Sequence, residues 1–148
     1  MIIVFIDGLI EPINPGGIAT YAFIIYNNGL KIFEKYGVIG IGPSMSNNLA
    51  EYYALYEALN FLMENELNNE KILVKSDSQL LINQMKGFWK ARGGLYYSIY
   101  MKVLELLIHF PRIEFIWIPR EENFEADLLS RKAYEEYIEN KSHERSGL

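Results

Sequence analysis

The chain has 148 residues, half of them hydrophobic, which is the usual size of one domain built around one core. Its longest uninterrupted apolar runs, residues 1–6 and 22–26, are far below the roughly 18 residues that a membrane-spanning helix needs, so no membrane partner is expected. Without cysteine the chain has no disulfide or thiolate metal site, and its net charge of −5 argues against a general nucleic-acid binder.

The first part of the chain is predicted to form three strands. Residues 2–6 are an unbroken run of β-branched and aromatic types, typical of a strand buried on both faces, and Asp7 follows at its predicted carboxyl end. After a turn rich in Gly and Pro, the patterns of residues 18–26 and 30–39 predict two more strands, which an Asn-Asn-Gly sequence would join as a hairpin.

The rest of the chain alternates helices with two further strands. Ser46 or Asn47 can cap a helix over residues 49–66, and the apolar residues within 71–76 predict a fourth strand that ends before Asp77. The other predicted elements are a short helix, a long helix, a strand and a last helix, over residues 78–86, 95–109, 113–118 and 124–137.

The order of these elements predicts the fold class, an α/β fold with a five-stranded mixed sheet flanked by helices. Three antiparallel strands come first, and strands connected through helices follow. One domain is predicted over residues 1–138, followed by a polar tail over residues 139–148. Because the N-terminus lacks the features of a secretory or transit segment, we expect a cytoplasmic protein, and we expect it to be a monomer.

Four acidic side chains lie where they could meet at one site. Asp7 and Asp77 follow apolar strands, and ligands of open α/β sheets bind at that end of the strands. Glu51 lies on the apolar stripe of its helix, in register with Leu55, Ala58 and Leu62. Asp127 begins the last helix on a face that it shares with Phe124, Tyr134 and Ile138, which predicts an inward side chain. Each acid taken singly also fits an ordinary turn, capping or first-turn position.

A cluster of three or four carboxylates needs a cation, because mutual repulsion raises the pKa of each group. Magnesium suits oxygen ligands, and manganese could replace it. A pair of such ions about 3.5–4 Å apart can stabilise the attacking and the leaving oxygen of phosphoryl transfer. The acids therefore suggest phosphodiester hydrolysis.

Four segments around these acids, in order, resemble the type 1 ribonuclease H family from Ile3 to about Ala133. They are Phe5-Ile6-Asp7-Gly8 followed by Asn14-Pro15-Gly16-Gly17, then Ser46-Asn47-Asn48-Leu49-Ala50-Glu51, then Lys75-Ser76-Asp77-Ser78-Gln79, and finally residues 118–127. The last three are similar to the family's Thr-Asn-Asn-x-x-Glu, Thr-Asp-Ser-Gln and Asn-x-x-Ala-Asp.

The resemblance implies a ribonuclease H-like fold and an endonuclease that hydrolyses the RNA strand of an RNA/DNA hybrid with two metal ions, leaving 5′-phosphate and 3′-hydroxyl ends. The catalytic, metal-binding residues that it implies are Asp7, Glu51, Asp77 and Asp127. The residues that it implies in the minor groove of the hybrid are Asn14, Asn47, Asn48 and Gln79. Backbone amides near Gly8 and the Glu51 carboxylate would sense the RNA 2′-hydroxyl.

Two features depart from the family pattern. Many members carry a His in the loop before the last Asp, but residues 119–126 have none, and His143 or Glu122 could substitute. The family's basic protrusion is also missing, because residues 87–94 form only a short loop. Four residues remain there that could contact a DNA-strand phosphate or belong to an ordinary solvated loop: Lys86, Trp89, Lys90 and Arg92.

Local Lys and Arg would then meet the substrate despite the acidic net charge, so we expect weak and salt-sensitive hybrid binding. Helical spacing predicts a packing role for a group of tyrosines at positions 52, 53, 56, 96, 97 and 100.

Two other functions stay open. A catalytically silent nucleic-acid-binding module would have no need of all four acids, and a 3′ exonuclease or junction resolvase of the same fold also uses clustered acids.

Overall fold

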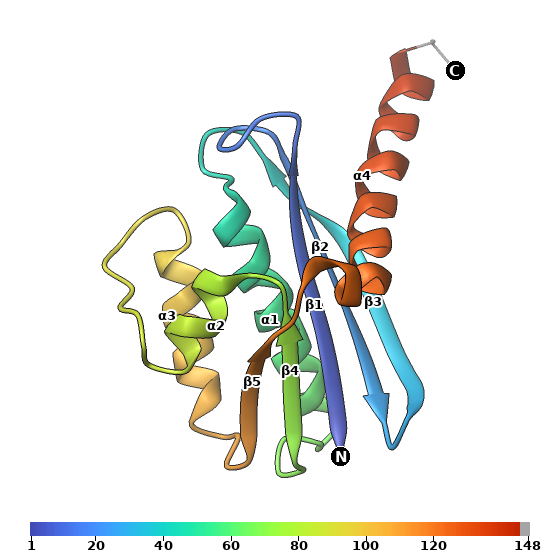
Figure 1. The fold of residues 1–148 in the computed structure, drawn as a ribbon. Helices are drawn as coiled ribbons and strands as arrows, with labels where there is room; N and C mark the ends of the chain where they lie inside the picture. The colour runs from blue at the N-terminus through green and yellow to red at the C-terminus, as the bar shows by residue number, and fades with distance from the viewer. Residues whose placement is uncertain (146–148) are drawn as a thin grey trace.

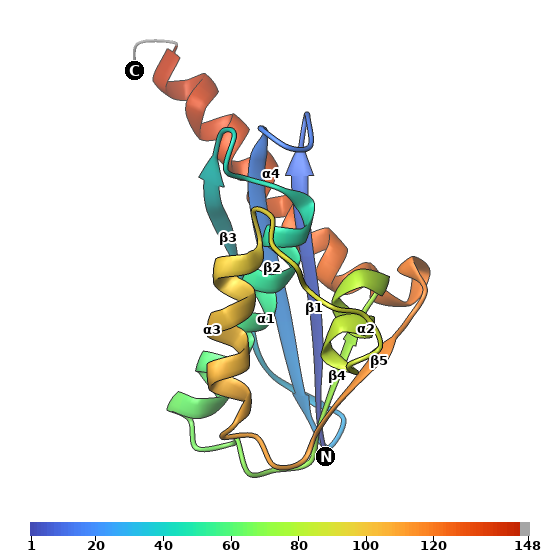
Figure 2. The same ribbon diagram turned by 90° about the vertical axis from the view of Figure 1, so that its left-hand side faces the viewer.

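The computed structural model describes residues 1–145, which form a five-stranded sheet with helices against both faces (Figure 1, Figure 2). The strands are β1 (Ile2–Glu11), β2 (Ile18–Asn27), β3 (Leu30–Ile41), β4 (Ile72–Ser76) and β5 (Ile113–Trp117). The helices are α1 (Asn47–Glu64), α2 (Gln79–Met85), α3 (Tyr97–Leu107) and α4 (Phe124–Arg145), with a 3-10 turn, η1 (Arg120–Asn123), before α4. The types and order of the helices and strands are those that the sequence predicts.

The strands lie in the order β3-β2-β1-β4-β5, which confirms the predicted mixed sheet. β1 pairs antiparallel with β2, and β2 with β3, whereas β4 runs parallel to both β1 and β5. α1 packs on β1 and β2 from one face, and α4 packs on β1, β2 and β3 from the other (Figure 1). β1 is therefore the central strand and has helices on both sides.

The sequence predicts that Asp7 follows the carboxyl end of the first strand, and this prediction is wrong. β1 continues to Glu11, so Asp7 lies inside the strand. The strand does not stop at Asp7 because β2 pairs with it over all 10 of its residues. β4 pairs with only the first part of β1, as far as Phe5 opposite Lys75. Asp7 therefore lies just beyond the end of the parallel pairing, at the level of Asp77.

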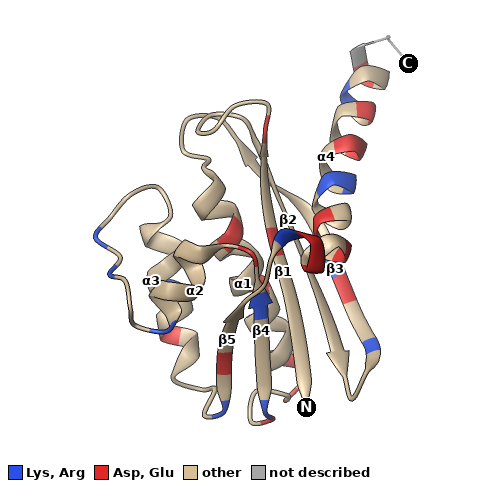
Figure 3. Ribbon diagram, viewed as in Figure 1, with Lys and Arg blue, Asp and Glu red and all other residues tan. Residues whose placement is uncertain are grey.

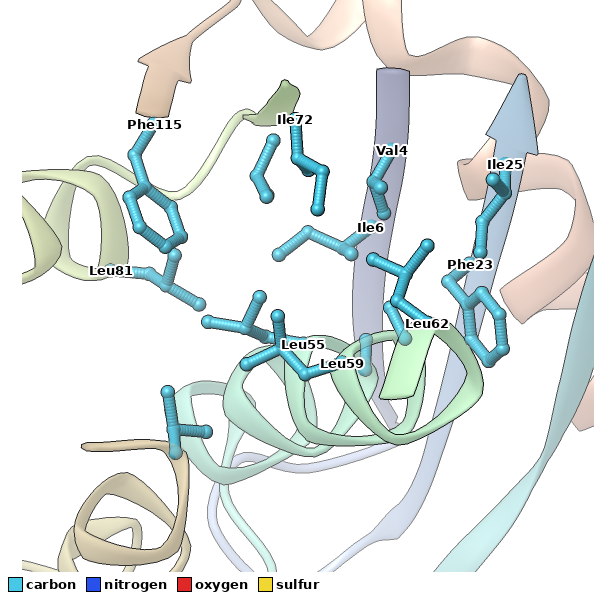
Figure 4. Packing of buried hydrophobic residues seen from close by; sticks show 14 of the residues in the cluster. Val4, Ile6, Phe23, Ile25, Leu55, Leu59, Leu62, Ile72, Leu81 and Phe115 are labelled. Carbon is cyan, nitrogen blue, oxygen red and sulfur yellow. The ribbon is translucent and has the colours of Figure 1, made fainter. Parts of the chain in front are cut away.

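The hydrophobic core lies between the sheet and α1 (Figure 4). Fully buried side chains of β1 and α1 meet there: Val4, Ile6, Leu55, Leu59 and Leu62. Because side chains alternate along a strand, the odd-numbered residues of β1, Asp7 among them, face the side of α4. Glu51 approaches the same region from the opposite face, on the first turn of α1.

α4 differs from its prediction in length and in the face that it buries. The helix continues to Arg145 instead of ending near residue 137, so residues 139–145 of the expected tail are helical, and residues 139–144 are exposed. Residues 146–148 lie outside the described part. Its buried residues are Ala126, Ser130 and Ala133, whereas Phe124 is 63% exposed and Ile138 43% exposed. The small side chains let the helix approach the sheet, and the apolar face predicted for Asp127 was therefore wrong. No helix within residues 1–145 combines the length and apolar character needed to cross a membrane.

Candidate active site

Three acids from separate elements meet beside the central strand β1, where its pairing with β4 ends. Asp7 comes from the middle of β1, Glu51 from the first turn of α1 and Asp77 from the residue after β4. One carboxylate oxygen of each lies within 4.8 Å of those of the other two. The structure thus brings together three of the four acids that the sequence indicated.

The close approach of α1 to β1 depends on Gly8. A Cβ atom at this position would lie 2.4 Å from both the carbonyl carbon of Ala50 and the backbone nitrogen of Glu51, far inside van der Waals contact. The start of α1 is fixed by Ser46, whose side chain accepts a hydrogen bond of 3.2 Å from the backbone N–H of Leu49, which confirms one of the two predicted caps. Glu51 can reach the strand only because residue 8 has no side chain.

Burial makes these acids difficult to ionise. Burial raises the pKa of Asp7 to about 7. A hydrogen bond from Ser130 opposes this rise, and the negative charges of Asp77 and Asp127 add to it. Burial and then the neighbouring charge of Asp7 raise the pKa of Glu51 well above its ordinary value, and burial also raises the pKa of Asp77. Ionising all three carboxylates therefore requires positive charge beside them.

The donor set fits a hard divalent cation. Asp7 is 4% exposed and Glu51 5% exposed, so water reaches these carboxylates poorly. The Oε2 atom of Glu51 is buried and has no hydrogen-bond partner within the described residues. A buried oxygen without a partner costs stability unless something binds it, and a group with only oxygen donors suits Mg²⁺ or Mn²⁺.

Asp127 lies beside this cluster but outside the group of three. Its Oδ2 atom lies 3.4 Å from Nε of Arg131, and its Oδ1 atom lies 3.9 Å from Nη2 of Arg120. Its side chain is 23% exposed. Neither arginine stands out in the sequence as a site residue, although the spacing of Arg131 four residues after Asp127 on one helix is a usable signal.

The acids open into a cavity of about 660 Å³ that most of the predicted substrate-binding residues also line. Those that line it are Gly8, Asn14, Asn47, Asn48 and Gln79. The Oδ1 atom of Asn14 accepts a hydrogen bond of 3.0 Å from the backbone N–H of Asn47, which joins the turn after β1 to the start of α1. Trp117, Arg120 and Arg131 line the cavity as well, and the sequence analysis did not select them.

Trp89 and Lys90 are not among the residues that line this cavity. They lie on the loop between α2 and α3, on which Figure 3 shows only basic charges. Gln84 anchors this loop, because its Nε2 atom donates hydrogen bonds to the carbonyl oxygen of Lys90 (3.3 Å) and to the hydroxyl of Tyr96 (2.8 Å). The ring of Tyr96 stacks on buried Tyr52, so these two tyrosines pack as predicted.

The two candidates for the missing loop His also lie outside the cavity. His143 is on the exposed outer part of α4, where its Nε2 atom is 3.9 Å from Oε1 of Glu139. Glu122, on η1, lines a separate apolar pocket with Phe124. The described residues therefore offer no histidine at the acid cluster.

The sheet order, the covering helices and the three convergent acids define the class of this protein as a ribonuclease H-like domain. Its sequence also matches, over residues 16–133, the family described as Reverse transcriptase-like, which covers most of the chain. The chain belongs to this family, and its solved structural neighbours include type 1 ribonucleases H.

Three similar proteins illustrate the relationship. The crystal structure of LC11 ribonuclease H1 in complex with an RNA/DNA hybrid superposes with a TM-score of 0.84 at 30% identity, covering 93% of this chain and 99% of the other. The putative hydrolase EbsB of Enterococcus faecalis is 31% identical over 97 residues, 66% of this chain and 71% of that protein.

The third is the bifunctional protein Rv2228c of Mycobacterium tuberculosis, 31% identical over 122 residues, which are 81% of this chain and 32% of that protein. Its N-terminal ribonuclease H domain, solved as a fusion, superposes with a TM-score of 0.78 at 28% identity over 89% of this chain and 97% of the other. The chain thus spans about a third of the mycobacterial protein.

Proposed function

We propose that this protein is a metal-dependent endonuclease that hydrolyses the RNA strand of RNA/DNA hybrids and leaves 5′-phosphate and 3′-hydroxyl ends. The observation that carries the proposal is the cluster of buried Asp7, buried Glu51 and half-buried Asp77, in which one Glu51 oxygen has no hydrogen-bond partner among the described residues. The similarity to LC11 ribonuclease H1, which was solved with a hybrid, supports the choice of substrate.

Asp7, Glu51 and Asp77 would hold the divalent cations, and Asp127 would complete the site from its rim. When bound there, a pair of Mg²⁺ ions would supply the positive charge that stabilises the attacking and the leaving oxygens of the phosphodiester. The protein's own part is to keep the carboxylates converged before substrate arrives. β1, α1 and β4 do this through backbone pairing and through the contact at Gly8.

The other side chains of the cavity would bind and orient the hybrid. Asn14, Asn47, Asn48 and Gln79 offer amide donors and acceptors in this cavity, suited to base edges and sugars in a wide, shallow minor groove. Backbone amides near Gly8 and the Glu51 carboxylate would sense the RNA 2′-hydroxyl, which distinguishes RNA from DNA.

Two groups of basic residues would meet phosphates, one group inside this cavity and one outside it. Arg120 and Arg131 border the acids and would neutralise phosphate charge near the cleaved bond. Trp89 and Lys90 lie on the loop outside the cavity and would contact the DNA strand farther along the duplex. These contacts are few, so hybrid binding should be weak, and it should weaken further as salt rises because each phosphate contact releases counterions.

The decisive experiment compares labelled RNA/DNA, DNA/DNA and RNA/RNA duplexes with Mg²⁺, with Mn²⁺ and with a chelator. We expect cleavage of the RNA strand of the hybrid with either metal and none with the chelator. Asp77→Asn should reduce cleavage to background while the protein stays folded, because it removes one ligand charge. Glu114→Gln is the matched control, since Glu114 is an exposed acid on the neighbouring strand β5.

The other outcomes would each overturn the proposal. Hybrid binding without cleavage by the wild-type protein would indicate a catalytically silent nucleic-acid-binding module. Cleavage of DNA/DNA at a rate equal to that of the hybrid would indicate another nuclease of the same fold. Equal rates for the Asp77→Asn and Glu114→Gln variants would remove Asp77 from the active site.

A further inference from the structure

Ser130, near the start of α4, places a buried hydroxyl directly against the acid cluster. Its Oγ atom donates a hydrogen bond of 2.6 Å to Oδ2 of Asp7, 123 positions earlier in the chain. The residue is 0% exposed, so solvent does not compete for this bond. The length is typical of a hydroxyl bonded to a charged carboxylate, about 2.5–2.7 Å. α4 is thus attached to β1 at the acid that lies deepest in the sheet.

The Ser130 hydroxyl has two acceptors within hydrogen-bond distance, the carboxylate of Asp7 and a backbone carbonyl of its own helix. A serine side chain inside a helix commonly bonds to a carbonyl oxygen one turn earlier in its own helix. That acceptor is available, because the carbonyl oxygen of Asp127 lies 3.0 Å from Oγ of Ser130. One hydroxyl proton cannot serve both acceptors fully, and the carboxylate of Asp7 is the nearer and the more strongly attracting.

We propose that Ser130 is a positioning residue for Asp7. Its hydrogen bond holds the Asp7 carboxylate in one orientation and sets the distance between Asp7 and the first turn of α4, which carries Asp127. An ionised carboxylate has about four acceptor positions on its two oxygens, so a bond from Ser130 leaves room for a cation. The inference rests on the proposed metal-dependent function, because this orientation matters only where Asp7 holds an ion.

Thr20 on β2 provides a matched control. Its Oγ1 atom donates a hydrogen bond of 2.9 Å to the backbone carbonyl of Ser130, and its side chain is also fully buried. Thr20→Val and Ser130→Ala each remove one buried hydroxyl bond between the sheet and α4. Only the bond of Ser130 ends on an acid of the cluster, so a purely structural role predicts similar effects from both changes.

The test measures Mg²⁺ affinity without nucleic acid, by following the backbone amide signals of β1 in an NMR titration. We expect Ser130→Ala to bind Mg²⁺ about tenfold more weakly than the wild-type protein, because a hydrogen bond to a charged group contributes about this much. Thr20→Val should stay near the wild-type affinity. On hybrid substrate, Ser130→Ala should lower kcat at saturating Mg²⁺ and leave KM unchanged, because the contacts with the nucleic acid remain.

Unchanged Mg²⁺ affinity in Ser130→Ala, or equal weakening in both variants, would overturn the proposal. Should Ser130→Ala fail to fold, Ser130→Cys keeps the volume with a much weaker donor, and the same weakening of Mg²⁺ binding is expected of it. The measurement is independent of cleavage. A wild-type protein that binds Mg²⁺ without cleaving hybrids would refute the proposed function, and the comparison of the variants would still decide the role of Ser130.

Discussion

Replacing Asp7 with Asn should stabilise the metal-free protein at neutral and alkaline pH. The pKa of Asp7 is about 7 in the folded protein, against 3.8 for an ordinary side chain. Between these values, rising pH removes a proton from the unfolded chain that the folded protein retains, so folding weakens by about 1.4 kcal/mol per pH unit. Above the folded pKa the accumulated cost is about 4 kcal/mol.

Asn removes the charge that causes this cost and keeps an oxygen that can accept the hydrogen bond of Ser130. The variant should therefore be more stable than the wild-type protein by about 4 kcal/mol near pH 8 in the presence of a chelator. The difference should decrease as the pH falls and should disappear below about pH 3, where Asp7 is protonated in both states.

Urea unfolding of both proteins across this pH range measures the difference directly. Mg²⁺ should reduce the difference in stability between the two proteins, because the cation stabilises the ionised wild-type site and not the variant. Glu114→Gln controls for the loss of an acid elsewhere, and its stability should stay close to that of the wild-type protein. An Asp7→Asn variant that is no more stable than the wild-type protein at pH 8 would show that burying the ionised Asp7 carboxylate does not lower the free energy of unfolding.

Two further changes test the support of the site and the core. Gly8→Ala should abolish cleavage and lower the free energy of unfolding, measured with urea, by about 3 kcal/mol, because the new methyl group meets the backbone of α1 at 2.4 Å. Full activity of this variant would mean that α1 can move away from β1 without harm to the site. Leu59→Ala should lower the free energy of unfolding by about 2–5 kcal/mol, because Leu59 is fully buried. The folded variant should keep the Mg²⁺ affinity of the wild-type protein. A lowered affinity would couple this core position to the site.

The sequence predicts the types and order of the elements because hydrophobic periodicity depends on each segment alone. Element ends are less well predicted, since they depend on partners. Asp7-Gly8 looks like the end of a strand, yet β2 pairs with β1 on both sides of it. α4 continues past residue 137 because its mostly polar residues still favour a helix, even though residues 138–144 are exposed.

Asp7, Glu51 and Asp77 were identifiable because they interrupt or end apolar patterns, which is a local signal. The arginines beside Asp127 and the bond from Ser130 to Asp7 were not, because they depend on how α4 is rotated against the sheet. Small residues, Ala126 and Ala133, set that rotation. The apolar residues on which the sequence prediction relied, such as Phe124, face outward.

The pairing of β1 along its entire length has a consequence for how the protein loses activity. A central strand that pairs with a neighbour along its whole length exchanges the amide protons of that pairing mainly when the whole domain opens. Asp7 sits in the middle of that strand, so its placement and the global fold should disappear in the same cooperative transition. Heating should therefore produce a mixture of competent and fully unfolded molecules, and activity should decline in parallel with the circular dichroism signal.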